Sequence, residues 1–352
     1  MSSLALSGAS GLTADWLNEA LSSRLAGVKV TGVETAPVGT GQVSDTFRLS
    51  LAYDRPADLP ATLIAKVPAL DPESRAAARA IRTYEIEAGF YTHLARGLAS
   101  AVPVCHFSAH DPGSDDYAVL LEDLAPARPG DQLAGITVEE AAAVVDELAL
   151  LHAAGWDSPD LAALPWLNRH DAASAEFTAA LITGLYEGFR ERYADDLTPE
   201  VFALLEGFLP RLGAYLTPGS GPFTLTHGDF RADNLLFGRG RPVILDWQTC
   251  AYGSPLSDLS YLLGSSLPVE ARRAHEHTLV RRYHAALTSN GTPLSWDDCW
   301  TAYREHAFHG IAMGVGASML VERTDRGDEM FCTMVTRHAH HALDLDSLSL
   351  VA

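Results

Sequence analysis

The sequence predicts an α+β protein with two lobes: a small N-terminal lobe built on an antiparallel sheet with one long helix, and a larger helical C-terminal lobe. Three observations support this prediction. The first third of the chain is rich in short β-forming runs, residues 125–135 (APARPGDQLAG) form a Pro/Gly-rich linker, and the remainder shows mainly helical periodicity. A chain of 352 residues is long enough for two hydrophobic cores. We therefore place the lobes at residues 1–124 and 125–352.

The N-terminal lobe is predicted to begin with a helix and to continue as strands. Thr13 is positioned to cap a helix that extends to about Leu25. Residues 27–39 and 44–53 are β-rich and flank the turn GTGQ, so they predict a hairpin. The lobe is completed by a strand over 61–69 (ATLIAKVPA), one long helix over 73–96, and two strands over 102–110 and 117–124.

Helices dominate the predicted C-terminal lobe. Thr137 and Glu140 stand at capping-box spacing ahead of a helix that contains the run AAAVVDELALLHAAG. Further helices are predicted over 172–194, 198–215, 255–264, 268–288, 295–322 and 327–345. The runs NLLF and PVILDW interrupt this pattern and predict a strand hairpin around the turn GRGR.

The composition narrows the class of partner. A formal net charge of −20 argues against nucleic acid, because phosphate backbones require clustered Lys and Arg. The acidity maintains solubility and is compatible with a cationic or neutral small molecule. Four cysteines without a CxxC pair predict free thiols in a reducing cytoplasm. No run resembles a signal peptide or is long enough to span a bilayer, so we expect a cytoplasmic protein without a membrane partner. The oligomeric state cannot be inferred from the sequence.

Residues 226–248 (THGDFRADNLLFGRGRPVILDWQ) place polar side chains at both ends of apolar strand runs. A hairpin centred on Gly240 would place Asn234 directly opposite Asp246, and such neighbours have Cβ atoms roughly 4.5–5.5 Å apart. Two oxygen ligands at that separation suit magnesium, which completes its shell with water and phosphate oxygens. Asp229, on the preceding loop, would face the same ion and remain free to accept a proton.

Lysine usage indicates a second functional position. Of the 25 basic residues, only Lys29 and Lys66 are lysine. Phosphoryl transfer in kinases uses a strand-borne lysine paired with a helix glutamate, and Lys66 ends the run IAK on a predicted strand. A compact ammonium is not interchangeable with a planar guanidinium. Lys29 is interpreted as a solvated edge charge. Glu85 and Glu87, both on the predicted long helix, are the alternative partners of Lys66.

The pattern HGDxxxxN, followed by a strand that ends in Asp, resembles the kinase-like small-molecule phosphotransferases: aminoglycoside phosphotransferases, choline kinases and ecdysteroid-kinase-like proteins. The runs HGDFRADNLLF, ILDWQ, DLSYLLGSSL and ERTDRGDEMF look closest to the bacterial ecdysteroid-kinase-like branch. This resemblance implies a two-lobed protein-kinase-like fold. It also implies an ATP- and Mg²⁺-dependent O-phosphotransferase that acts on a hydroxyl group of a small molecule.

The resemblance assigns roles to five residues. Asp229 becomes the catalytic base, or the group that orients the acceptor hydroxyl, and Asn234 and Asp246 become the magnesium ligands. Lys66 would bind the nucleotide phosphates. The glutamate of the family pattern stands three residues before an aromatic pair, which favours Glu87 as the partner of Lys66.

The resemblance also implies nucleotide contacts in the N-terminal lobe. The turn VGTGQVSDTF would cover the phosphates, with Gly39, Gly41 and Ser44 as candidate contacts. This turn lacks the GK[ST] of a P-loop and the third glycine of a dinucleotide fingerprint. The hinge whose backbone holds adenine would lie over residues 121–124, with Glu122 and Leu124 as the candidate contacts.

Several polar residues have structural interpretations. His227 is expected to fix the loop by hydrogen bonds. Asp258 either anchors the catalytic loop from the following helix or caps that helix. His338, His340 and His341 are expected to be a polar stretch of the terminal helix, with metal binding as the alternative.

Alternative functions remain open from the sequence. A nucleotide-binding pseudokinase would share the fold without turnover. A metal-dependent hydrolase built on His227 and Asp229 would need further ligands at close spacing. The acceptor could be an aminoglycoside-like amine or a steroid or hydroxyacyl-type alcohol. We expect its contacts on helices after residue 255 and within 172–215.

Overall fold

The computed structural model describes residues 8–39, 43–169, 171–219 and 221–351. The chain forms two compact units. The N-terminal unit comprises the residues up to Leu98, together with Val102–Pro126 and Leu245–Thr249, and the C-terminal unit comprises Ala99–Ala101, Ala127–Ile244 and Cys250–Ala352. A five-residue segment from far along the chain, which includes Asp246, therefore belongs to the N-terminal unit.

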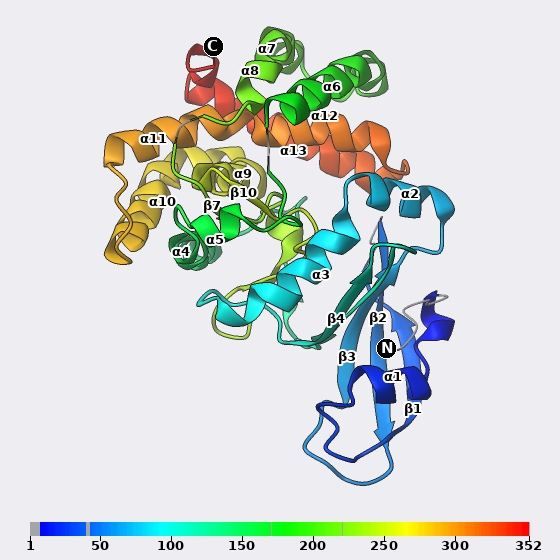
Figure 1. Cartoon of the computed structure of the whole chain (residues 1–352). Helices are drawn as coiled ribbons and strands as arrows, with labels where there is room; N and C mark the ends of the chain where they lie inside the picture. Colours follow the sequence, from blue (N-terminus) through cyan, green and yellow to red (C-terminus); the bar gives the residue numbers. More distant parts are fainter. Residues whose placement is uncertain (1–7, 40–42, 170, 220, 352) are drawn as a thin grey trace. The chain divides into compact units, whose positions relative to one another are not determined.

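The N-terminal unit is built on a five-stranded antiparallel sheet (Figure 1). Its strands are β1 (Val30–Pro37), β2 (Ser44–Tyr53), β3 (Thr62–Pro68), β4 (Cys105–Asp111) and β5 (Asp116–Glu122), in the spatial order β1-β2-β3-β5-β4. All five strands were predicted. The middle of the sheet is the most deeply buried part, because β3 and β5 have neighbours on both edges and are rich in Val, Leu and Ala.

Helix α1 (Ala14–Ala20) packs beside β1, where Trp16 and Leu17 join the core on one face of the sheet. Thr13 caps it as predicted, because its hydroxyl accepts the N–H of Trp16 at 3.2 Å. The helix ends at Ala20, so the predicted extension to about Leu25 is wrong. The residues that follow form turns rather than a further helical turn.

The predicted single helix over 73–96 is two helices, α2 (Pro72–Ala80) and α3 (Thr83–His93), followed by a short 3₁₀ turn, η2 (Ala95–Gly97). The break lies at Arg82, whose φ of +60° is left-handed and cannot continue a right-handed helix. The break lets α3 turn onto the sheet, where it packs against β4 and β5.

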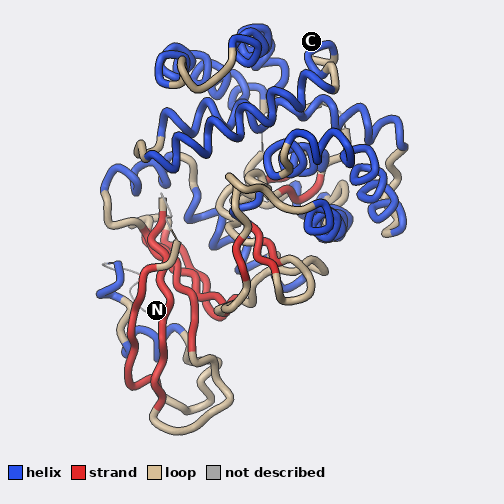
Figure 2. Tube along the Cα trace, turned by 180° about the vertical axis from the view of Figure 1, so that it is seen from behind, coloured by secondary structure: helices blue, strands red, loops and turns tan. Residues whose placement is uncertain are grey.

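The C-terminal unit is mainly helical, as the blue segments of Figure 2 show. Its longer helices are α4 (Val138–Ala154), α6 (Ala172–Arg192), α7 (Pro199–Phe208), α9 (Pro255–Ser266), α10 (Val269–Ser289), α11 (Trp296–Glu305), α12 (His309–Leu320) and α13 (Asp325–Asp344), with the short α5 (Pro159–Ala162) and α8 (Leu212–Leu216) between them. The predicted capping box is present at α4, where Thr137 and Glu140 satisfy each other's backbone N–H groups. The predicted helices over 198–215 and 295–322 are each interrupted by a 3₁₀ turn, η3 (Leu209–Arg211) and η5 (His306–Phe308).

Helix α9 is the central element of this unit. All of its residues except Ser257 are buried, and α4, α10, α11, α12 and α13 pack around it. A helix enclosed on every side must satisfy its polar side chains internally. Asp258 lies near the start of α9 and is fully buried, so we expect it to be a centre of hydrogen bonding.

The predicted polar stretch RHAHH is wrong for two of its three histidines. His338 and His341 are fully buried on α13, and His340 is half-buried. Glycines on neighbouring helices make room for the His338 ring, since a Cβ at Gly310 would lie 1.9 Å from its Nε2 and one at Gly264 would lie 2.6 Å from its Nδ1. The sequence alone could not show this close helix packing.

Short strands complete the C-terminal unit. β7 (Thr224–Thr226) pairs with β10 (Ala251–Gly253), and β8 (Leu235–Phe237) pairs with both β6 (Arg128–Pro129) and β9 (Val243–Ile244). The hairpin of β8 and β9 was predicted, whereas β6 and β10 were not.

The predicted register of that hairpin is wrong. Leu235 pairs with Ile244, which centres the turn between Arg239 and Gly240 instead of on Gly240. The paired strands also stop short of the two candidate metal ligands. Asn234 ends a 3₁₀ turn, η4 (Ala232–Asn234), and Asp246 follows the end of β9 with a left-handed φ of +61°. Asn234 and Asp246 are therefore not cross-strand partners.

Two expectations from composition can be compared with the fold. All four cysteines lie in the described part of the chain, and none of them forms a disulfide bond there. Within the described residues, no helix combines the length and the apolar character that a bilayer crossing would need.

Candidate active-site residues

Lys66, Glu87 and Asp246 meet within the N-terminal unit. Lys66 Nζ, on β3, lies 2.5 Å from Oε1 of Glu87 on α3 and 2.8 Å from Oδ1 of Asp246. Glu85, the alternative partner, lies on the exposed side of α3 and pairs with Arg82 at 2.8 Å. The glutamate that pairs with Lys66 is therefore Glu87.

Burial and charge together keep Lys66 protonated. Burial alone would lower the pKa of Lys66, but the negative charges of Asp246 and Glu87 outweigh that effect and raise it. Burial raises the pKa of Glu87, and the charge of Lys66 is the main effect that opposes this rise. The Tyr117 hydroxyl donates to Oε2 of Glu87 at 3.1 Å. An ammonium has three donor hydrogens, and two carboxylates use two of them, so one remains for an anion.

Packing holds Asp246 beside Lys66. The fully buried ring of Trp247 stacks on Phe90 of α3, with ring centroids 3.8 Å apart and planes 6° from parallel. This contact fixes the Leu245–Thr249 segment in the N-terminal unit, and the side chain of Gln248 donates to Oδ2 of Asp246 at 3.2 Å. Asp246 thus keeps a fixed, partly exposed carboxylate.

The predicted phosphate-covering turn is described only in part. Gly39 has a φ of +75°, which favours glycine, and no atom of the described residues lies within 4 Å of the position that a Cβ would take. Gly41 lies outside the described residues. Ser44, the first residue of β2, is buried, and its side chain is a hydrogen-bond partner of Tyr117. Ser44 therefore lies close to the Glu87 carboxylate, with which Tyr117 also bonds.

The two predicted hinge residues lie at the end of β5. The backbone N–H of Glu122 donates to the Val104 carbonyl at 2.9 Å, and its side chain accepts the Val104 N–H at 2.8 Å. Leu124, two residues further on, is buried. The N–H of Glu122 is thus already used within the protein. The roles of both residues in nucleotide binding stay predictions.

In the C-terminal unit, a tight loop follows β7 and presents Asp229. Gly228 has a φ of +84°, which explains why glycine precedes Asp229. The buried carboxylate of Asp258 accepts the backbone N–H of His227 at 2.6 Å and that of Gly228 at 3.0 Å. Asp258 therefore anchors the loop, and the N-cap of α9 is Ser254 instead.

Histidines fix the same loop. Nδ1 of His227 accepts the backbone N–H of Asp229 at 3.3 Å, which confirms its predicted structural role. Nε2 of His309 lies 3.1 Å from the Gly228 carbonyl. His152, on α4, lies 3.4 Å from Asp258. Burial alone would raise the pKa of Asp258, but the hydrogen bond and charge of His152 lead the effects that lower it.

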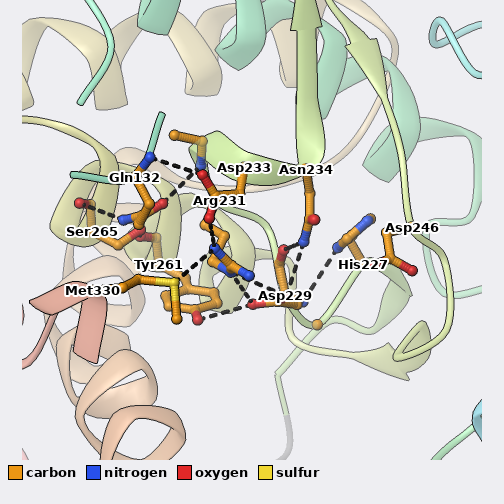
Figure 3. A network of polar contacts seen from close by, with 12 residues as sticks. Gln132, His227, Asp229, Arg231, Asp233, Asn234, Asp246, Tyr261, Ser265 and Met330 are labelled. Carbon is orange, nitrogen blue, oxygen red and sulfur yellow. Dashed lines mark hydrogen bonds and ion pairs between the residues drawn. The ribbon is translucent and has the colours of Figure 1, made fainter. Parts of the chain in front are cut away.

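Four contacts converge on the Asp229 carboxylate (Figure 3). The Tyr261 hydroxyl donates to Oδ1 at 3.0 Å, and Nδ2 of Asn234 donates to Oδ2 at 2.9 Å. Nε of Arg231 lies 3.0 Å from Oδ1 and 3.2 Å from Oδ2. Nδ2 of Asn234 also donates to the backbone carbonyl of Asp229 at 2.8 Å, so these two predicted site residues are brought together.

These contacts keep Asp229 ionised. Burial alone would raise the pKa of Asp229, but the charge of Arg231 leads the effects that outweigh burial and lower it. The hydrogen bonds from Tyr261 and Asn234 act in the same direction. A carboxylate with a lowered pKa is a weak base, so the arrangement favours an orienting role over strong proton abstraction.

The donor atoms of both candidate ligands fit a magnesium ion. The amide nitrogen of Asn234 is engaged with Asp229, which leaves the amide oxygen to face a cation. Asp246 contributes a carboxylate. Magnesium prefers such hard oxygen ligands and takes few of them from protein. The part of the chain that the structure describes contains no group of three or more His, Cys, Asp or Glu side chains able to hold a metal ion.

Sequence reasoning missed several residues that support these sites. Tyr117 and His152 reach their carboxylate partners only through tertiary packing, so no local pattern indicates them. Tyr261 could have been found, because it follows Asp258 by three residues and therefore shares its face of the helix. Arg231 could also have been found, since it lies two residues after Asp229 and two residues before Asp233.

Comparisons with known proteins agree with this fold. A protein from Ralstonia eutropha JMP134, assigned as an aminoglycoside phosphotransferase, superposes with a TM-score of 0.55 at 15% identity, covering 95% of this chain and 96% of that one. Choline kinase from Cryptosporidium parvum Iowa II gives a TM-score of 0.54 at 11% identity, covering 91% of each chain. A thermostable mutant of the aminoglycoside phosphotransferase APH(4)-Ia, in a ternary complex with ADP and hygromycin B, gives 0.50 at 14% identity, covering 95% and 98%. No curated protein matches the chain.

The fold and the family match place the chain in the kinase-like small-molecule phosphotransferase superfamily, as the sequence resemblance predicted. The model of the ecdysteroid kinase-like family matches residues 39–295, well over half of the chain. The chain belongs to the ecdysteroid kinase-like family.

Proposed function

We propose that this protein is an ATP- and Mg²⁺-dependent O-phosphotransferase that phosphorylates a hydroxyl group of a small molecule. The observation that carries the proposal is the buried ion pair of Lys66 and Glu87, with Asp246 as the second carboxylate on the same ammonium. A strand lysine, a helix glutamate and an aspartate after an apolar strand are the parts that phosphoryl transfer in kinases requires. The solved structure of the APH(4)-Ia mutant in its complex with ADP and hygromycin B supports nucleotide use in this superfamily.

In the proposed reaction, the acceptor hydroxyl oxygen forms a bond to the γ-phosphorus of ATP. The bond between that phosphorus and the β–γ bridging oxygen breaks, and ADP leaves with the bonding electrons. Asp229 orients the hydroxyl and takes its proton as the new bond forms. The lowered pKa of Asp229 favours proton transfer late in this step, when the attacking oxygen has become acidic.

Lys66 supplies positive charge to the nucleotide phosphates through its remaining donor hydrogen. Glu87 restricts the ammonium to one position because it is buried and hydrogen-bonded to Tyr117. Asn234 and Asp246 would hold magnesium through their side-chain oxygens. The bound ion would neutralise charge on the phosphate oxygens.

Further nucleotide contacts are proposed from the sequence pattern. Gly39, Gly41 and Ser44 would cover the phosphates, and Glu122 and Leu124 would form the adenine hinge. Since the Glu122 N–H is occupied by Val104, we expect the Glu122 carbonyl and the Leu124 backbone to make the adenine contacts.

The acceptor remains a choice between two chemical classes, aminoglycoside-like amines and steroid or hydroxyacyl-type alcohols. Aminoglycoside-like amines fit the acidic composition of the chain. Steroid or hydroxyacyl-type alcohols fit the family to which the chain belongs. We propose a cytoplasmic location, since the four cysteines of the described residues form no disulfide bond with one another.

ADP release measured against a panel of alcohols from both classes, at millimolar MgATP, tests the proposal. Release that depends on one alcohol, together with the phosphorylated product in a mass spectrum, is the expected result. MgATP binding with no release for any alcohol would favour the pseudokinase alternative. Absence of both binding and release would contradict the proposed function altogether.

A further inference from the structure

Arg231 lies two residues after Asp229 in the loop, and its side chain folds back onto that residue. The Arg231 side chain is largely buried, with 17% exposed. Its Nε lies almost equally far from both Asp229 oxygens, at 3.0 and 3.2 Å, while Nη1 donates to Oδ2 of Asp233 at 2.7 Å. One guanidinium therefore joins the two acidic residues on either side of it.

Asp233 in turn is tied to the core of the C-terminal unit. Its Oδ1 accepts the backbone N–H of Gln132 at 2.9 Å. The fully buried side chain of Gln132 donates to the Ser265 carbonyl at the end of α9 and accepts the N–H of Ala232. Figure 3 shows this continuous chain of contacts, which runs from Asp229 through Arg231 and Asp233 to Gln132 and Ser265.

We infer that Arg231 is a positioning residue, which holds the Asp229 carboxylate against the buried scaffold of Asp233, Gln132 and Ser265 in the orientation that the acceptor hydroxyl needs. This inference rests on the proposed function. Arg231 acts on the reaction through Asp229 and does not itself have to touch the acceptor.

The hydrogen-bond capacity of Asp229 supports this role. A carboxylate offers about four acceptor positions. Tyr261, Asn234 and Arg231 supply one donor hydrogen each, the last being shared between the two oxygens. At least one acceptor position is therefore left for the hydroxyl, in a direction that the three donors fix.

A lysine cannot reproduce the arrangement. The guanidinium presents separate, rigidly spaced N–H groups to Asp229 and Asp233, whereas an ammonium is one compact group on a flexible stem. The planar guanidinium of Arg231 also contacts Met330, whose sulfur lies 3.7 Å from Nη1. Arg231→Lys keeps the charge but loses the fixed geometry.

The test combines kinetics with a structural readout. Arg231→Met should lower kcat by about 10²-fold, the cost of misplacing a reacting group by roughly 1 Å, and should leave MgATP affinity unchanged. Arg231→Lys should restore part of the loss.

In an Asp229→Asn background, Arg231→Met should cause no further loss, because the group that Arg231 positions has already been removed. The same change at exposed Arg282, which pairs with Asp146, is the matched control and should alter nothing.

Crystal structures of the full-length wild type and of Arg231→Met give a readout that needs no acceptor. The wild-type Asp229 carboxylate should occupy one conformer bonded to Tyr261 and Asn234, and the variant should show it displaced or divided among conformers. If Asp229 kept its position in the variant, or if Arg231→Met caused the same loss in both backgrounds, the inference would be wrong. Absence of any phosphotransfer by the wild type would contradict the proposed function instead, and the crystal structures would still decide the role of Arg231.

Discussion

The Lys66 ammonium lies 2.5 Å from Glu87, a carboxylate with 1% of its side chain exposed. Two residues away on the same helix, Glu85 forms an exposed pair with Arg82. We expect Glu87→Gln to lower the free energy of unfolding by about 1–3 kcal/mol, because a charge-assisted buried hydrogen bond is weakened. Glu85→Gln should change it by about 0–1 kcal/mol, as for other surface pairs. Urea denaturation of the two variants compares them directly, and equal effects would show that burial does not distinguish the two pairs.

The two lysines of the chain allow a second comparison. Lys66→Ala should lower phosphotransfer and weaken MgATP binding, because it removes the only lysine held beside two carboxylates. Lys29, which precedes β1, is exposed, and Lys29→Ala should be close to neutral. Nucleotide titration and turnover measure both variants. Equal losses in the two would remove the reason for assigning Lys66 to the phosphates.

Asp258→Asn should loosen the loop that presents Asp229. The amide would place an N–H donor against the N–H groups of His227 or Gly228, which Asp258 now accepts. We expect a loss of about 1–3 kcal/mol in unfolding free energy and a fall in kcat, with MgATP affinity little changed. Asp146→Asn, at an exposed ion pair, is the matched control. Unchanged turnover in Asp258→Asn would contradict the anchoring role.

Buried histidines predict how stability depends on pH. Burial lowers the pKa of the fully buried His338 to about 3 and that of the partly buried His306 to about 4, from an ordinary value near 6.5. The unfolded chain therefore binds these protons first as pH falls. Stability should be greatest above about pH 6.5 and should fall toward pH 4, by up to about 1.4 kcal/mol per pH unit for each histidine.

The matched pair for this prediction lies on one helix. His338→Gln should flatten the acid dependence of the unfolding free energy, whereas His340→Gln, at a half-buried position, should retain the wild-type slope. Chemical denaturation between pH 4 and pH 7 measures both slopes. An unaltered slope in His338→Gln would show that this imidazole does not stay neutral in the folded protein.

The fold could be predicted from the sequence where local patterns determine structure. The strand that carries Lys66 and the capping box of Thr137 and Glu140 both follow from short-range rules, and both are present. The predicted long helix failed because Arg82 takes a left-handed conformation, which side-chain periodicity does not reveal. The hairpin register failed because a shift of half a residue in the turn changes every cross-strand pair.

The sequence predicted candidate site residues only where their type and spacing indicate a role. Lys66 was identified because phosphate chemistry needs an ammonium restrained by a carboxylate, whereas Glu87 was chosen over Glu85 only through the resemblance to the family. The pairing of Lys66 with Asp246 could not be foreseen, since it depends on the stacking of Trp247 against Phe90. The burial of His338 likewise depends on glycines from two other helices.

The division of roles between Asp229 and Asp246 is tested most directly by titrating MgATP into Asp229→Asn and Asp246→Asn and measuring turnover of each with an identified acceptor. Asp229→Asn should keep MgATP affinity nearly intact while turnover falls by about 10²–10⁴-fold, the usual contribution of a positioned base. Asp246→Asn should lose metal-nucleotide affinity as well as turnover, because it removes a charged ligand. Loss of nucleotide binding in Asp229→Asn with full activity in Asp246→Asn would contradict the proposed mechanism.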